Sequence, residues 1–123
     1  MPLKGWIAVD FDGTLATFEG NGTLLGYPIA PMVNRVKTWL RNEQEVKIFT
    51  SRVSFKDVEK NAAIEHAIRE WCLVHIGRKL EVTCTKDINC VQIWDDKAIR
   101  VIRNTGLSEH EYRAKRGKNA ARR

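Results

Sequence analysis

The fold of this chain is decided by Trp6-Ile7-Ala8-Val9-Asp10-Phe11-Asp12-Gly13-Thr14-Leu15. Its first four residues are apolar and lack helical spacing, which predicts a strand buried on both faces. Asp10 and Asp12 follow where that strand ends, and Gly13 lets the chain turn sharply away. Ligands of parallel α/β sheets bind outside the carboxyl ends of the strands, so two acids here favour a metal-binding or reactive site. Asp-Gly is also an ordinary turn signal, which is the alternative interpretation of the pair.

The segments after this strand predict an alternating α/β fold. Residues 16–30 contain three glycines and Pro28, which favours a loop or small hairpin, the candidate lid of the site. A helix opening near Pro31, a strand over 45–50 and a helix that begins after Ser54 or Asp57 and runs toward Gly77 complete a βαβα pattern. Further strands are expected near 80–84, 91–94 and 98–103, and a last helix from Ser108 to about residue 118.

We therefore expect a three-layer, Rossmann-like α/β domain with a small, mostly parallel sheet of about five strands. Only about six residues separate the strands near 80–84 and 91–94. That distance is too short for the crossover helix that a parallel pair normally needs, which predicts a tight loop or an altered geometry at this corner.

The composition is that of one globular domain. The chain has 123 residues, 43% of them hydrophobic and 29% charged, which leaves no room for a separate cap domain over the site. No apolar run is long enough for a transmembrane helix, and no signal peptide precedes the first strand, so we expect a cytoplasmic protein without membrane contact. The three cysteines lack metal-ligand spacing and are expected to be reduced core or near-core residues.

The positive charge is concentrated at the C-terminus. Residues 107–123 carry +4 of the net charge of +6, which divides the chain into a catalytic domain over 1–106 and a basic helix or tail over 107–123. Such a tail can attract nucleic acid through sequence-independent electrostatics. The alternative is a solvated chain terminus without a partner.

The string Asp10-Phe11-Asp12-Gly13-Thr14 resembles the first motif, Asp-x-Asp-x-Thr, of the haloacid dehalogenase superfamily of phosphohydrolases and phosphotransferases. Thr50 ends the second expected strand and resembles the second motif. Lys86 follows the third strand as the lysine of the third motif does, and Asp95-Asp96 resemble the paired acids of the fourth. The resemblance runs from about Trp6 to Ile102.

This resemblance implies a role for each acid. Asp10 would be the nucleophile that forms an aspartyl phosphate. Asp12 would protonate the leaving alcohol and then activate water, and its backbone carbonyl would bind Mg²⁺. Lys86 would neutralise the transferred phosphoryl group, Asp95 would bind the metal and Asp96 would support that shell.

The residue types agree with this chemistry. Converging carboxylates repel one another unless a cation neutralises them, and oxygen ligands without a His or Cys cluster suit Mg²⁺ rather than zinc. The expected metal site therefore comprises Asp10, Asp12, Asp95 and Asp96. The expected phosphate-binding residues are Gly13, Thr50, Ser51 and Arg52, the last through a second anionic group of the substrate.

Each assignment has a structural alternative. Thr50 could be only a strand-ending turn residue. Lys79 and Lys97 compete with Lys86 for the role of the lysine, and Asp95-Asp96 could cap a following helix.

The sequence thus predicts a capless, Mg²⁺-dependent phosphatase that hydrolyses phosphomonoesters. Its open site would admit a macromolecule, or be enclosed by another subunit of a homo-oligomer, and the basic tail makes a nucleotide or a nucleic-acid end an attractive substrate. The alternative from another class is a nucleic-acid-binding or regulatory module that keeps the fold without useful turnover.

Overall fold

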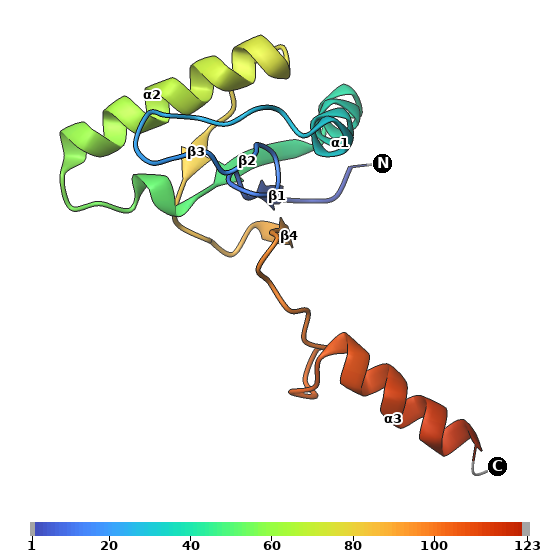
Figure 1. Ribbon diagram of the computed structural model, residues 1–123. Helices are drawn as coiled ribbons and strands as arrows, with labels where there is room; N and C mark the ends of the chain where they lie inside the picture. The colour runs from blue at the N-terminus through green and yellow to red at the C-terminus, as the bar shows by residue number, and fades with distance from the viewer. Residues whose placement is uncertain (1, 122–123) are drawn as a thin grey trace.

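The computed structural model describes residues 2–121, with side chains as far as residue 117. Within that range the regular elements, in chain order, are β1 (Trp6–Val9), α1 (Ala30–Arg41), β2 (Glu45–Phe49), the 3₁₀ turn η1 (Ser51–Val53), α2 (Val58–His75), β3 (Val82–Thr83), β4 (Cys90–Trp94) and α3 (Glu109–Ala121) (Figure 1). None of the helices described is long and apolar enough to cross a membrane.

The sheet has four strands in the order β3-β2-β1-β4, and every neighbouring pair is parallel. The expectation of an α/β fold with a small parallel sheet is therefore confirmed. Val9 is paired with Ile48 on β2 and with Trp94 on β4. As a result, the segments that follow these three strands meet at one edge of the sheet.

The hydrophobic core lies on the face of the sheet that α1 and α2 cover. Ile7 and Val9 of β1 and Val46 and Ile48 of β2 point to this face. They pack in one cluster with residues of both helices, namely Met32, Val33 and Val36 of α1 and Ile64, Ile68, Trp71 and Cys72 of α2. Both helices lie on the same face because two successive right-handed crossovers, β1 to β2 and β2 to β3, run in one direction along the sheet.

The opposite face differs from the expected three-layer arrangement, because none of the described helices packs on it. The segment 84–89 crosses this face instead, where the Nε1–H of Trp6 donates to Asp87 at 2.8 Å. Six extended residues reach about 20 Å, whereas the three strand spacings from β3 to β4 need about 14 Å. The short link is therefore long enough to cross the sheet as an extended chain but too short to form a helix on the way.

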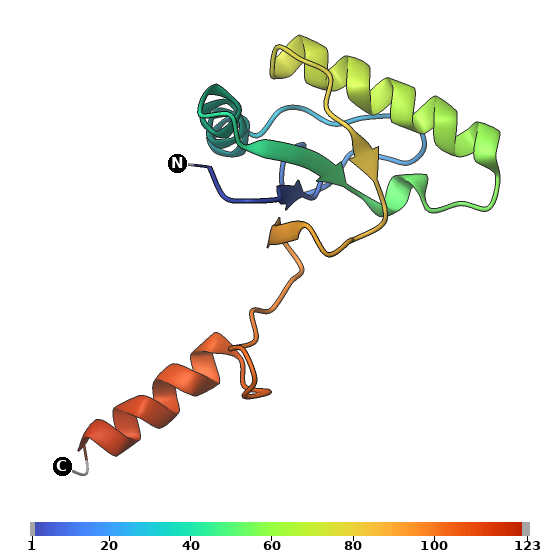
Figure 2. The ribbon, with the colours of Figure 1, turned by 180° about the vertical axis from the view of Figure 1, so that it is seen from behind.

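The expectation of a fifth strand near 98–103 is wrong. Val101 makes a single bridge to Ser108, and the N–H of Ile102 donates to the carbonyl of Leu107. This segment pairs with the residues just after it, around a turn in which Gly106 has a φ of +71°. The sheet therefore ends at β4, and α3 extends away from the sheet and its helices in both views (Figures 1 and 2).

The helix boundaries follow the expected signals. Pro31 is in the first turn of α1, the Asp57 carboxylate accepts the N–H of Lys60 at the start of α2, and Gly77, with a φ of +102°, follows its end. Ser108 and Glu111 form a reciprocal capping box on α3. The basic residues Arg122 and Arg123 lie outside the described residues.

Candidate functional site

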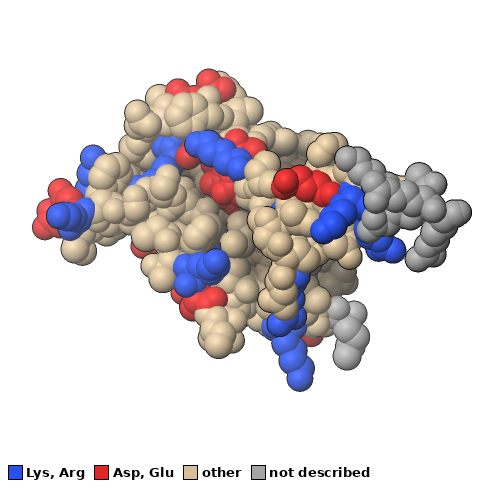
Figure 3. All heavy atoms as spheres, turned by 90° about the horizontal axis from the view of Figure 1, so that it is seen from below, with Lys and Arg blue, Asp and Glu red and all other residues tan. Residues whose placement is uncertain are grey.

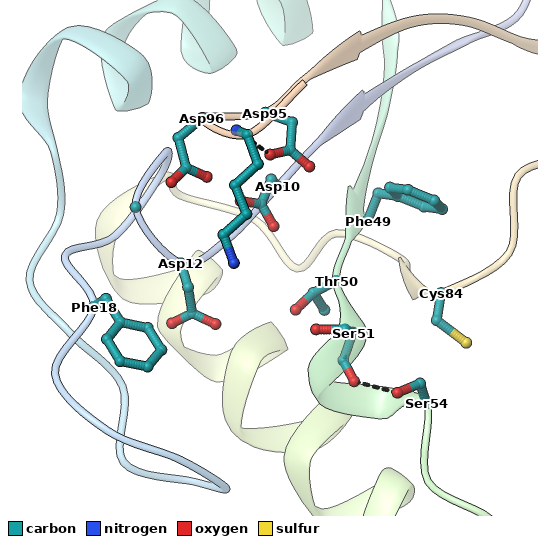
Figure 4. Close-up of a pocket in the computed structure, with 12 residues that line it drawn as sticks. Asp10, Asp12, Phe18, Phe49, Thr50, Ser51, Ser54, Cys84, Asp95 and Asp96 are labelled. Carbon is teal, nitrogen blue, oxygen red and sulfur yellow. Dashed lines mark hydrogen bonds between the residues drawn. The ribbon is translucent and has the colours of Figure 1, made fainter. Parts of the chain in front are cut away.

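A cavity of about 520 Å³ opens at the carboxyl edge of the sheet. It is lined by the segments that follow β1, β2 and β4, by Cys84 after β3 and by Phe18 of the loop between β1 and α1 (Figure 4). The described residues that line it include most of those the sequence predicts for the site: Asp10, Asp12, Gly13, Thr50, Ser51, Asp95 and Asp96. Lys86 and Arg52 are not among them.

Three carboxylates gather at one end of this cavity. Asp10, Asp95 and Asp96 each offer an oxygen, and these atoms lie within 4.8 Å of one another. Figure 4 shows the three side chains grouped at the ends of β1 and β4. The group has only oxygen donors, which suits a hard divalent cation such as Mg²⁺. The expected fourth member, Asp12, directs its carboxylate elsewhere.

The electrostatics of this group centre on Asp10. Burial raises its pKa to about 7, and a hydrogen bond with Asp96 and the negative charges of Asp95 and Asp96 add to the rise. The N–H of Phe11 acts in the opposite direction. The pKa of Asp96 is lowered, chiefly by its hydrogen bond with Asp10. Without a cation, Asp10 is therefore only partly ionised near neutral pH.

Gly13 and Thr14 hold the acidic group together from the turn after β1. Gly13 has a φ of +80°, and a Cβ there would stand 2.7 Å from an Asp96 carboxylate oxygen, so the position needs glycine. The Thr14 hydroxyl lies 3.4 Å from an oxygen of Asp10 and 3.4 Å from one of Asp96, and it accepts the N–H of Asp96 at 3.1 Å. Thr14 is the last residue of the first motif, although it is not among the residues that the sequence predicts for the site.

Asp12 faces Arg52 instead of the other acids. The Nε and Nη2 of Arg52 each donate to one Asp12 oxygen at 2.7 Å, which makes a two-pronged ion pair. The Arg52 side chain is only 7% exposed, and its remaining donors bind loop carbonyls. In this arrangement the guanidinium has no N–H left for a substrate, in contrast to the contact that the sequence suggested.

Thr50 and Ser51 form the wall of the cavity after β2. Thr50 is buried, its N–H donates to the carbonyl of Thr83, and its hydroxyl accepts the N–H of Arg52 at 3.2 Å. This last contact caps η1, so the turn role that competed for Thr50 is present together with its position in the cavity. The carbonyl of Ser51 accepts the Ser54 hydroxyl, which fixes the turn (Figure 4).

Among the described residues, the lysine that lines the cavity is Lys97. Lys86 lies in the segment 84–89 on the sheet face away from α1 and α2, where its side chain is exposed, and Lys79 pairs with Glu70 at 3.0 Å. Lys97 follows Asp95-Asp96 directly, and its N–H donates to Asp95 at 2.8 Å. The Asp95 side chain thus closes a turn and does not cap a helix. The sequence feature that indicates Lys97 as a site residue is its position just after the carboxyl end of β4.

Two aromatic side chains line the cavity. Phe18, on the loop between β1 and α1, is 65% exposed, and Phe49, the last residue of β2, is half-buried. Figure 4 shows Phe18 near Asp12 and the Phe49 ring on the other side of β2 from the acids. An exposed phenylalanine beside polar groups is a surface on which a planar ligand can stack.

Comparisons with known proteins bear on the fold alone. No protein-family model and no curated protein matches the chain. The chain is similar to a solved structure of a conserved protein from Bacteroides thetaiotaomicron, with a TM-score of 0.55 at 18% sequence identity over 96% of this chain and 93% of that one. The similarity supports an α/β fold that extends over nearly the whole length of the chain.

Proposed function

We propose that this protein is a Mg²⁺-dependent phosphomonoester hydrolase of the kind its motifs resemble, the haloacid dehalogenase superfamily. One observation carries the proposal. Oxygens of Asp10, Asp95 and Asp96 lie within 4.8 Å of one another in a cavity that Thr50 and Lys97 also line. Carboxylates for a metal beside hydroxyl and ammonium donors are what a transferring phosphoryl group needs.

The residues present fit a magnesium ion. All three neighbouring ligands are carboxylates, and the pKa of Asp10 is raised chiefly by burial and further by the negative charges of Asp95 and Asp96, which a cation would neutralise. Asp10, Asp95 and Asp96 would hold the ion, together with the Asp12 carbonyl that the resemblance implies. The bound ion would supply charge neutralisation for the nucleophile and the phosphoryl oxygens.

The chain's own residues then divide the reaction into two steps. In the first, an oxygen of Asp10 bonds to phosphorus, the bond from phosphorus to the leaving oxygen breaks, and Asp12 gives that oxygen a proton. In the second, Asp12 takes a proton from water, whose oxygen attacks phosphorus and releases phosphate and free Asp10. Thr50, Ser51 and Lys97 hold the phosphoryl oxygens, and Lys97 takes the place that the sequence analysis gave to Lys86.

The cavity favours a substrate with a planar group. Phe18 and Phe49 both line the cavity, and stacking of a base on an aromatic side chain contributes about 1–3 kcal/mol. A volume of about 520 Å³ is in the range of small-molecule sites. We therefore favour a nucleotide or a phosphorylated nucleic-acid end over a sugar phosphate.

The test is phosphate release with and without Mg²⁺ from nucleotides, sugar phosphates, phosphopeptides and phosphorylated oligonucleotides. We expect turnover that requires Mg²⁺ and falls by at least about 100-fold in Asp10→Asn, which keeps the shape of the side chain but cannot form the aspartyl phosphate. Lys79→Gln, at a lysine outside the cavity, is the matched control. Equal activity of the native protein and Asp10→Asn would overturn the mechanism.

One observation favours the alternative of a nucleic-acid-binding module. Helix α3 extends away from the rest of the molecule and carries exposed Arg113, Lys115 and Arg116. On the face shown in Figure 3, however, basic side chains are separated by acidic and uncharged surface and do not form one continuous stripe. Helix α3 is therefore more consistent with an accessory contact than with a complete binding surface.

A further inference from the structure

Arg52 is the most completely bonded charged side chain at the site. A guanidinium has five N–H groups, and the contacts of Arg52 account for all of them. Two groups bind the Asp12 oxygens at 2.7 Å. Two on Nη1 bind the carbonyls of Gly22 and Leu24 at 2.8 and 3.0 Å, and the second on Nη2 binds the carbonyl of Gly20.

These contacts join three segments that are far apart in the chain. Arg52 belongs to η1 after β2, Asp12 lies 40 residues before it in the turn after β1, and the three carbonyls belong to the loop that carries Phe18. The same loop has a second anchor, because the Nε1–H of Trp71 on α2 donates to the carbonyl of Gly26 at 2.9 Å. The part of the loop over 18–24 precedes the Gly26 anchor and is held to the domain mainly through Arg52.

We propose that Arg52 is a positioning residue that binds both the Asp12 carboxylate and the loop 18–24. It thereby fixes the orientation of the acid/base group and the position of Phe18, the aromatic residue of this loop, relative to the cavity. This inference rests on the proposed function for the role of Asp12. Both Asp12 oxygens accept from Arg52, which fixes the plane of the carboxylate relative to the cavity. Lysine at this position would keep the charge but, with one ammonium, would not span two oxygens and three carbonyls.

The contact between Arg52 and Asp12 predicts which substrates are hydrolysed more slowly when Arg52 is replaced. Asp12 gives a proton to the leaving oxygen, so its orientation matters for an alkyl phosphate such as glycerol phosphate and much less for p-nitrophenyl phosphate, whose leaving group needs no proton. We expect Arg52→Lys to lower kcat/KM, which reports the first step, by about 100-fold on glycerol phosphate and by less than about 10-fold on p-nitrophenyl phosphate. In the Asp12→Asn background, Arg52→Lys should cause no further loss on glycerol phosphate.

A second measurement reports how firmly Arg52 holds the loop and does not depend on enzymatic activity. Amide hydrogen exchange should become faster at Leu24, whose N–H donates to the carbonyl of Asn21 within 18–24, when Arg52 is replaced by lysine or glutamine. Exchange in the interior of α1 should stay unchanged, which would show that the variant is folded. Arg113→Lys, which alters an exposed pair with Glu109 on α3, is the matched control and should change neither readout.

The outcomes are distinguishable. Equal losses of kcat/KM on the two substrates, or a full further loss in the Asp12→Asn background, would overturn a role through Asp12 and indicate a direct contact with substrate. Unchanged exchange of the Leu24 amide would overturn the link to the loop. If the native protein releases no phosphate at all, the proposed function fails, and the exchange measurement still decides whether Arg52 holds the loop.

Discussion

At the scale of single residues, Asp10 makes the stability of the metal-free protein depend on pH. Its pKa is raised from 3.8 to about 7 in the folded protein, so the folded state binds this proton more tightly than the unfolded state does. The stabilisation is fully present below about pH 4 and is lost as the pH rises to about 7. The lowered pKa of Asp96 stabilises the folded state above about pH 4, and this contribution is lost only as the pH falls below that value. We therefore expect the free energy of unfolding of the metal-free protein to decrease as the pH rises from about 4 to about 7.

Urea unfolding of the metal-free protein at several pH values measures this effect. Asp10→Asn removes the charge and keeps the shape, so we expect it to be more stable than the native protein at pH 8 and equally stable near pH 4. Added Mg²⁺ should stabilise the native protein at pH 8 and Asp10→Asn much less. A stability difference that does not change between pH 4 and pH 8 would contradict the assignment.

Thr14 tests whether the acidic group needs its hydroxyl. Thr14→Val keeps the shape of the side chain but removes the contacts with Asp10, with Asp96 and with the Asp96 N–H. Loss of such a supporting hydrogen bond typically weakens metal binding by about 10-fold or more. We expect this loss in a Mg²⁺ titration of Thr14→Val, whereas Thr14→Ser should retain affinity close to that of the native protein. Equal Mg²⁺ affinity of the valine and serine variants would show that the Thr14 hydroxyl does not support the metal site.

At the scale of elements, the loop between β1 and α1 forms one wall of the cavity. Phe18 is its exposed aromatic residue there, and stacking on a base predicts a role in affinity and not in chemistry. We expect Phe18→Ala to raise KM for a nucleoside monophosphate by about 10-fold, with kcat and the KM for glycerol phosphate little changed. Phe55→Ala, at an exposed phenylalanine that does not line the cavity, is the control. An equal rise for both substrates would rule out stacking.

At the scale of the whole molecule, α3 has few contacts with the rest of the fold among the described residues. None of its contacts with the sheet or the other helices is extensive among the described residues, and its main links are local, through its capping box and the pair of Arg100 with Glu109. We expect deletion of residues 109–123 to change the free energy of unfolding by less than about 1 kcal/mol and to leave turnover of small phosphate esters intact.

The same deletion separates the two proposed functions. If α3 is an accessory nucleic-acid contact, its loss should weaken oligonucleotide binding and reduce the dependence of that binding on salt. Replacing Arg113, Lys115 and Arg116 by glutamine in the full chain is the matched variant, because it removes the charge and keeps the helix. Loss of phosphatase activity on deletion would show instead that α3 is part of the catalytic unit.

The amino-acid sequence by itself determined the order β1, α1, β2 and α2, the caps at Asp57 and Ser108, and the gathering of Asp10, Thr50 and Asp95 at one edge of the sheet. Apolar spacing and helix caps are local signals, and parallel strands necessarily bring their carboxyl ends together. Only the tertiary structure decided that Lys97 and not Lys86 lines the cavity, that 98–103 is no strand, and that one sheet face is crossed by an extended link.

The tertiary structure also decided the partners of Arg52. The Asp12 carboxylate and the loop carbonyls lie 28 to 40 residues away from it in the chain, and carbonyl oxygens carry no sequence signal at all. A side chain with five donors can meet such distant acceptors only after the sheet has set η1 beside the turn after β1. Local sequence motifs therefore identify the residue types of the site, whereas the contacts between these residues depend on the packing of the whole domain.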